Sequence, residues 1–120
     1  MVAMLFAAGC SKNPKLTGKV YYADDNSPVV QGTVIFLSDN YTGRAQIERD
    51  GSYSVHSESD GFGLPPGTYR VYLDGTDKAT VEGGGVRLEK LVNSKYTSPG
   101  TSGLTLTHEK SQTYDIPVER

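Results

Sequence analysis

The sequence predicts an all-β fold, an antiparallel β-sandwich of about seven strands. Its 120 residues suit one domain, and 14 glycines, 8 tyrosines and no tryptophan favour short strands joined by frequent turns. The clearest stretch runs from Leu64 to Leu73, where prolines and a glycine predict a turn. After this turn, Tyr69, Val71 and Leu73 alternate with the more polar residues at positions 68, 70 and 72. This alternation predicts a strand with one buried face, and a core that contains Tyr69.

Two strands are expected at the start of the domain. Residues 16–22 alternate, which predicts a half-buried first strand. Residues 32–38 form a nearly continuous apolar run, which predicts a central strand covered on much of both faces. The connections at residues 24–28 and 39–43 are rich in Asp, Asn and other turn formers.

A hairpin is expected in the middle of the chain. Residues 44–48 and 52–56 flank Asp50-Gly51, a pair that suits turns requiring positive φ. The alternation places Tyr53 in the core, and residues 57–63 are expected to form a loop.

The last two strands are expected near the C-terminus. Residues 104–107 alternate cleanly, and residues 114–118 form the final strand. Pro117 predicts that this strand lies at a sheet edge or ends there, because proline cannot donate a ladder hydrogen bond.

The first residues suggest export and anchoring. Residues 1–9 are apolar and uncharged but too short to span a bilayer, so we interpret them as a remnant of a signal peptide. Ala7-Ala8-Gly9-Cys10 resembles the lipobox of bacterial lipoproteins. The resemblance implies a lipidated Cys10, a tether over residues 10–15 and, from Ser11, the outer membrane. The alternative is a chance cysteine, which has no partner for an internal disulfide.

A family resemblance covers residue 16 to about residue 75. The motifs that carry it, in order, are Gly18-Lys19-Val20, Ser27-Pro28-Val29, residues 32–37, Asp50-Gly51-Ser52-Tyr53 and residues 64–71. In these motifs the chain is similar to the carboxypeptidase-regulatory-like, or transthyretin-like, β-sandwich, which implies a Greek-key sandwich over residues 16–120. The remainder resembles a bacterial lipoprotein subgroup of that fold through Lys95-Tyr96, residues 101–105 and Tyr114-Asp115-Ile116.

The sequence offers little catalytic chemistry. The net charge is −2 and no Lys/Arg run exists, which argues against a nucleic-acid partner. His56 and His108 have no metal-like neighbours at ligand spacing, so we expect exposed structural positions for them and no cofactor. An oxygen-rich calcium site could be assembled from Asp24, Asp25, Asn26, Asp39 and Asn40, but turn chemistry is the favoured interpretation.

The expected function is a non-catalytic, lipid-anchored module of the cell envelope with a structural or protein-interaction role. Its partners would be the membrane, through Cys10, and an envelope protein or a glycan. The alternative is a carbohydrate-binding module on the same scaffold, because partly exposed aromatic rings bind sugars. The candidates for such rings are Tyr21, Tyr41, Tyr72 and Tyr96.

The long connection from Gly75 to Gly103 is where any binding is expected to occur, because connections beyond about 12–15 residues are uncommon unless functional or disordered. Residues 83–85 are expected to form a flexible loop or an irregular edge, and residues 86–92 fit a strand or a helical turn. Asn93 could cap a short turn that runs through Tyr96. The other interpretation, which is favoured, is a cover that shields a sheet edge. The candidate binding residues are Lys78, Arg87, Lys90 and Tyr96.

Overall fold

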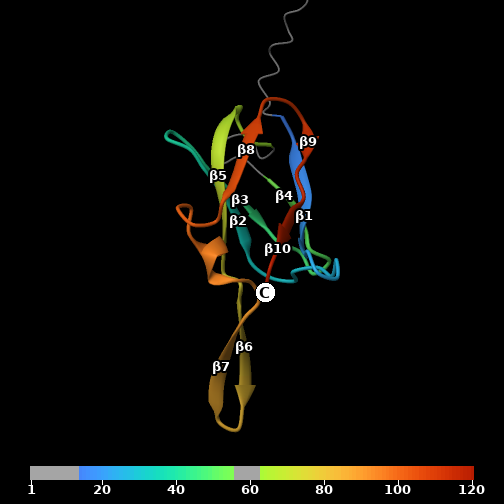
Figure 1. Ribbon diagram of the computed structural model, residues 1–120, viewed down its shortest axis with the longest axis vertical. Coiled ribbons are helices and arrows are strands. Elements are labelled where there is room, and N and C mark those ends of the chain that lie inside the picture. The colour runs from blue at the N-terminus through green and yellow to red at the C-terminus, as the bar shows by residue number, and fades with distance from the viewer. Residues whose placement is uncertain (1–13, 56–62) are drawn as a thin grey trace, which may run out of the picture.

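The computed structural model describes residues 14–55 and 63–120, and within them the chain is all-β, as predicted. Figure 1 shows two sheets that face each other and a two-stranded hairpin that leaves them at one end. The signal-peptide remnant, Cys10, His56 and nearly all of the expected loop at residues 57–63 lie outside the described residues.

One sheet has the order β3-β2-β5-β8, and all its pairs are antiparallel. β2 lies between β3 and β5, and Val34, Ile35 and Phe36 are buried in succession. The prediction of a central strand covered on both faces is therefore confirmed. The bounds are β2 Thr33–Leu37, β3 Thr42–Gln46, β5 Gly67–Asp74 and β8 Leu104–His108.

The second sheet is organised around β1, and here the structure departs from a purely antiparallel sandwich. β1 pairs antiparallel with β4 but parallel with β9 and β10. The segment that follows β8 therefore runs beside β1 in the same direction as β1. Pro117 lies on β10 at the edge of this sheet, as expected. The bounds are β1 Leu16–Tyr22, β4 Ser52–Ser54, β9 Gln112–Thr113 and β10 Ile116–Val118.

The remaining elements are β6 Asp77–Glu82, β7 Gly85–Lys90 and the 3₁₀ helix η2 Ser94–Thr97. With β6 and β7, the described residues contain ten strands, whereas about seven were expected. Gly83 and Gly84, expected in a flexible loop, form the two-residue turn between β6 and β7 with φ of 54° and 88°. Positive φ at both central residues is what a type I′ hairpin turn requires. Of the two alternatives for residues 86–92, the strand is present as β7. The short turn that Asn93 was expected to cap is present as η2, and the Asn93 side chain accepts a hydrogen bond from the Lys95 amide.

The core lies between the two sheets and contains both tyrosines expected there. Tyr53 and Tyr69 are almost completely buried. Each hydroxyl donates to a main-chain carbonyl, Tyr53 to Tyr114 at 2.5 Å and Tyr69 to Pro65 at 2.6 Å. Burial therefore leaves neither phenol without a partner, which is what a stable core requires.

Gly18 on β1 marks a close approach between β1 and the C-terminal segment. A Cβ atom at Gly18 would lie 1.9 Å from the carbonyl oxygen of Tyr114 and 2.9 Å from the hydroxyl of Tyr53. Any larger residue would push away the carbonyl that Tyr53 binds. Gly18, the first residue of the Gly18-Lys19-Val20 motif, thus has a packing role in this chain.

We predict that Tyr53→Ala lowers the free energy of unfolding by about 3–5 kcal/mol, because it leaves a large cavity between the sheets. Tyr53→Phe should cost about 1–3 kcal/mol, since it keeps the ring but leaves the Tyr114 carbonyl without its donor. Urea denaturation measures both. Tyr72→Ala is the matched control, because Tyr72 is only half-buried on the outer side of β5. Equal losses for Tyr53→Ala and Tyr72→Ala would contradict this account of the core.

Candidate binding surface

The β6–β7 hairpin projects from the sandwich on the side away from the start of β1 (Figure 1). Its ladder pairs Lys78 with Glu89, Ala79 with Leu88, Thr80 with Arg87 and Val81 with Val86. Every residue of β7 is exposed. Because residues directly opposite each other in a ladder share a face, the hairpin has two faces of different chemistry.

One face of the hairpin is apolar and open to solvent. It carries Ala79, Val81, Val86 and Leu88, and the last three are 76%, 70% and 66% exposed. Single exposed apolar residues are ordinary on protein surfaces. Four that adjoin on one face are not, and contiguous exposed apolar patches mark interaction sites in soluble proteins. We name this set the apolar face of the hairpin.

The opposite face is charged and carries two of the four residues expected to bind. Lys78 lies opposite Glu89, and Arg87 lies opposite Thr80. Lys90 lies on the other face, opposite Asp77. Tyr96 was expected to be partly exposed, and this was wrong. Its side chain is only 6% exposed and packs into the core from η2. The structure thus brings Lys78 and Arg87 to one face and separates both from Lys90 and Tyr96.

The apolar face was missed in the sequence, although a signal for it exists. Gly83-Gly84 is a two-residue turn signal, and apolar residues alternate on both sides of it, Ala79 and Val81 before and Val86 and Leu88 after. That pattern predicts a hairpin with one apolar face. The three basic residues do not lie together, because alternate residues of a strand point to opposite faces, so a site built from them does not reveal the apolar face.

The hairpin is held at its base by hydrogen bonds to the body. The Leu91 amide donates to the Thr76 carbonyl at 3.1 Å, which continues the ladder toward the sandwich. The Gln31 side chain donates to the carbonyls of Gly75 and Asp77, at 3.1 and 2.8 Å. The Tyr22 hydroxyl donates to the Leu91 carbonyl at 2.7 Å. The base is therefore fixed to β1 and to the segment before β2, while the apolar face remains open.

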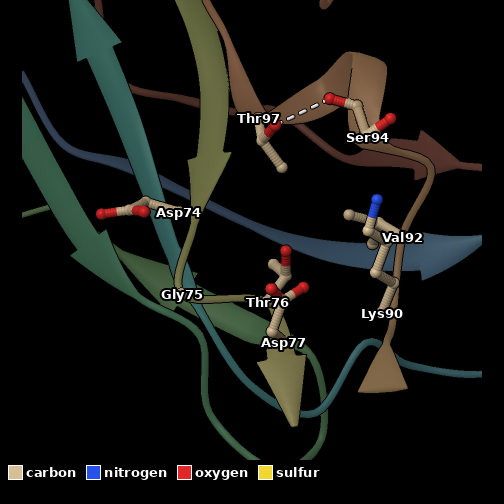
Figure 2. Close-up of a pocket in the computed structure, with 8 residues that line it drawn as sticks. All are labelled: Asp74, Gly75, Thr76, Asp77, Lys90, Val92, Ser94 and Thr97. Atoms are coloured by element: carbon tan, nitrogen blue, oxygen red, sulfur yellow. Dashed lines mark hydrogen bonds between the residues drawn. The ribbon is translucent and has the colours of Figure 1, made fainter. Parts of the chain in front are cut away.

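A cleft of about 330 Å³ lies where the hairpin meets the body (Figure 2). The hydroxyl of Thr97 donates to the Ser94 carbonyl at 2.7 Å and closes one wall. The carboxylate of Asp74 points away from the other labelled side chains in Figure 2. The described residues include no group of three or more His, Cys, Asp or Glu that could hold a metal ion. The lining residues are Asp74, Gly75, Thr76, Asp77, Lys90, Val92, Ser94 and Thr97.

His108, expected at an exposed position, is completely buried at the end of β8. One ring nitrogen lies 3.1 Å from the Pro14 carbonyl and the other 2.9 Å from the side-chain nitrogen of Gln112. Both ring nitrogens thus have structural partners, and the ring joins the start of β1 to β9. The correction follows from alternation along β8, which turns His108 and Leu106 to the same buried side.

The acidic turn after β1 shows turn chemistry. Asp25 accepts hydrogen bonds from the amide and the hydroxyl of Ser27, and these bonds lower the pKa of its carboxyl. Asp24 is paired with Arg120 at 2.9 Å, and the guanidinium lies 3.8 Å from the centre of the Tyr22 ring. These contacts tie the C-terminal residue to the turn.

The tyrosines considered for sugar binding do not form one platform. Tyr21 lies on β1 and Tyr72 on the outer side of β5, in different sheets. Tyr41, just before β3, is half-buried. The aromatic pair that the structure describes, Phe36 with Tyr53, lies in the core with ring centres 6.0 Å apart.

We predict that the four candidate binding residues of the sequence analysis differ in how much their substitution lowers the free energy of unfolding. Tyr96→Ser should lower the free energy of unfolding by about 3–5 kcal/mol, because it empties a core position. A combined Lys78→Ser, Arg87→Ser and Lys90→Ser variant should change it by no more than about 0.5 kcal/mol per substitution, as exposed sites do. Thermal and urea unfolding measure both. A large loss in the combined variant would show that the charged side chains hold the hairpin to the body.

Comparisons with known proteins support the fold alone. No protein-family model matches the chain, and no curated protein matches it. Among solved structures, the chain is similar to a DUF3823 family protein from Bacteroides ovatus ATCC 8483, with a TM-score of 0.52 and 20% sequence identity. The match covers 89% of this chain and 44% of that one, so this chain spans less than half the length of its structural neighbour. Within the described residues, no helix is long and apolar enough to cross a membrane. The chain therefore shares its β-rich fold with a DUF3823 family protein.

Proposed function

We propose that this protein is a non-catalytic, lipid-anchored module of the cell envelope that binds another protein through the β6–β7 hairpin. The observation that carries the proposal is the apolar face, with Val81, Val86 and Leu88 mostly exposed on an element that leaves the body. A two-stranded hairpin alone is at best marginally stable in water. An exposed one with an apolar face gains stability when a partner covers it or extends its sheet.

The proposed anchor is Cys10, on the grounds of its lipobox-like sequence. Acyl chains on this cysteine would hold the protein at the membrane, and Ser11 favours the outer membrane of a cell envelope. β1 begins at the end of the sandwich farthest from the hairpin (Figure 1). An anchor that precedes β1 would leave the hairpin directed away from the membrane surface, where a protein partner can reach it.

We assign the sandwich to the carboxypeptidase-regulatory-like kind as part of the same proposal. Two features support it. The prolines before Gly67 lead directly into β5, and Gly51 has the positive φ of 86° that an Asp-Gly turn uses. The non-catalytic assignment rests on the absence of a recognisable nucleophile–base pair in the sequence.

A carbohydrate-binding role is the second candidate, supported by one surface. A shallow cleft of about 220 Å³ is lined by Tyr21 with Lys19, Asn26 and Asp115. A half-exposed ring beside hydrogen-bonding side chains is the usual composition of a sugar site. A glycan array with the wild type and Tyr21→Ala tests it. Binding that Tyr21→Ala abolishes would favour this role, and an array without binding would leave the protein-binding role.

We predict that Cys10→Ala releases the protein from membranes, because no acyl chain can be attached. Each buried CH₂ contributes about 0.8 kcal/mol, so the loss of acyl chains removes stable anchoring. Fractionation of the native host that expresses wild type or Cys10→Ala measures the effect, and Lys12→Ala in the adjoining tether is the control that keeps the cysteine. Equal distribution of wild type and Cys10→Ala between the membrane and soluble fractions would refute the anchor.

A further inference from the structure

We infer that the protein partner of the hairpin is a second copy of this chain, and that two β7 strands pair antiparallel about a two-fold axis through Leu88. This proposal rests on the protein-binding role above and names the partner. It combines three observations: an open edge of β7, a charge pattern on β7 that complements itself in one register, and an apolar face that becomes continuous in that register.

The direction of the main-chain groups along β7 is known from its base. The Leu91 amide donates to Thr76 on the β6 side. In an antiparallel ladder, residues alternate between hydrogen-bonded and non-hydrogen-bonded pairs. Gly85, Arg87 and Glu89 therefore direct their main-chain groups toward β6. Val86, Leu88 and Lys90 direct theirs to the other edge, where β7 has no paired strand in the part of the chain that the structure describes.

The edge of β6 differs from that of β7. The carbonyl of Asp77 on β6 accepts a hydrogen bond from the Gln31 side chain at 2.8 Å. The base of β6 is thereby covered by the segment that precedes β2. A new strand can add along the whole of β7 but not along the whole of β6. An unpaired edge of this kind is the usual template for strand addition.

Among the registers that pair most of β7, the charges select one. When Leu88 lies opposite Leu88 of the second copy, each Arg87 lies opposite a Glu89, and each Val86 lies opposite a Lys90. A shift of the axis to Arg87 would place two arginines opposite each other, and a shift to Glu89 would oppose two glutamates. Opposite charges across strands stabilise a pair, and like charges directly opposite destabilise it. If the two-fold axis passed between two residues, the pairing would slip by one residue, and apolar side chains of one copy would lie on the charged face of the other.

The selected register builds a sheet of four strands in the order β6-β7-β7-β6. Its central row reads Ala79, Leu88, Leu88, Ala79, all on the apolar face. The adjoining charged rows read Lys78, Glu89, Arg87, Thr80, so acidic and basic residues alternate across the sheet. A sheet of three or more strands is stable where a lone hairpin is marginal. Each copy presents the same strand, as a closed two-fold dimer requires.

The antiparallel pairing places the two sandwiches at opposite ends of the shared sheet. In this register Gly84 of one copy lies level with Val92 of the other, beside the cleft at the hairpin base. The turn residues Gly83 and Gly84 carry no side chain that would collide there, and a Cβ at either position meets nothing within 4 Å in the single chain. The contact is small against the 1,200–2,000 Å² of a typical stable interface, so we expect a weak dimer.

A disulfide trap tests the register. In a full-length chain with Cys10→Ser, Leu88→Cys places two thiols across the two-fold axis. The Cα atoms of a hydrogen-bonded pair lie about 5.5 Å apart, within the range of a disulfide. We expect rapid formation of a covalent dimer under mild oxidation. Val86→Cys in the same background is the control: it is equally exposed, but its two copies would lie roughly 14 Å apart. Equal cross-linking of both variants would overturn the proposal.

Charge reversal tests the same register without cysteines. Arg87→Glu alone and Glu89→Arg alone should each weaken the dimer by about tenfold or more in dissociation constant, because each places like charges opposite each other twice. The double variant Arg87→Glu with Glu89→Arg restores both pairs and should regain the dimer. Sedimentation velocity over a concentration series of Cys10→Ser protein measures all four chains.

Three results would overturn the proposal: a monomer at every concentration, a double variant no better than the single ones, or assemblies that grow beyond a dimer. The last would indicate open pairing of β6 with β7. The lipid anchor is tested separately by fractionation. A monomer in solution together with Cys10-dependent membrane binding would thus refute only the partner named here.

Discussion

The fold depends on the contact between the C-terminal segment and β1 at Gly18. There the Tyr114 carbonyl lies directly over a position that has no side chain, and the Tyr53 hydroxyl binds that carbonyl from β4. The contact holds β9 and β10 parallel to β1 and completes the second sheet. It also positions the last residues, so that the Asn93 amide donates to the Glu119 carbonyl at 2.7 Å. The segment that closes the core thus also supports the chain just after the hairpin.

The buried core and the proposed binding surface occupy different parts of this molecule. The sandwich buries the large side chains between its sheets, whereas every residue of β7 is exposed. Low-stability elements with few buried contacts are where interaction surfaces are commonly found. The base of the hairpin is fixed by Gln31 and by the ladder from Thr76 to Leu91, so the apolar face is presented in a defined direction. A surface built in this way can evolve new partners without a change in the core.

Much of the sandwich could be predicted from the sequence, because burial on one face produces a period-two pattern. That reasoning located β2, β5 and the inward Tyr53 and Tyr69 correctly. It could not reveal that β9 and β10 run parallel to β1, since strand direction depends on contacts far apart in the sequence. It also misplaced His108, whose burial requires both Pro14 and Gln112 as partners. The candidate site expected from the sequence and the apolar face of the hairpin fall in the same segment, residues 75–103, but the expectation named charged residues and not the apolar ones.

The central claim is that the hairpin stands alone in the single chain and gains a neighbour along β7. Amide hydrogen exchange of Leu88, followed by NMR over a concentration series of Cys10→Ser protein, tests it most directly. The Leu88 amide points to the open edge, so it should exchange rapidly in dilute protein and slowly as the dimer forms. The Val71 amide, in the middle of the four-stranded sheet, should stay protected throughout. Exchange at Leu88 that is independent of concentration, whether fast or slow, would contradict the account.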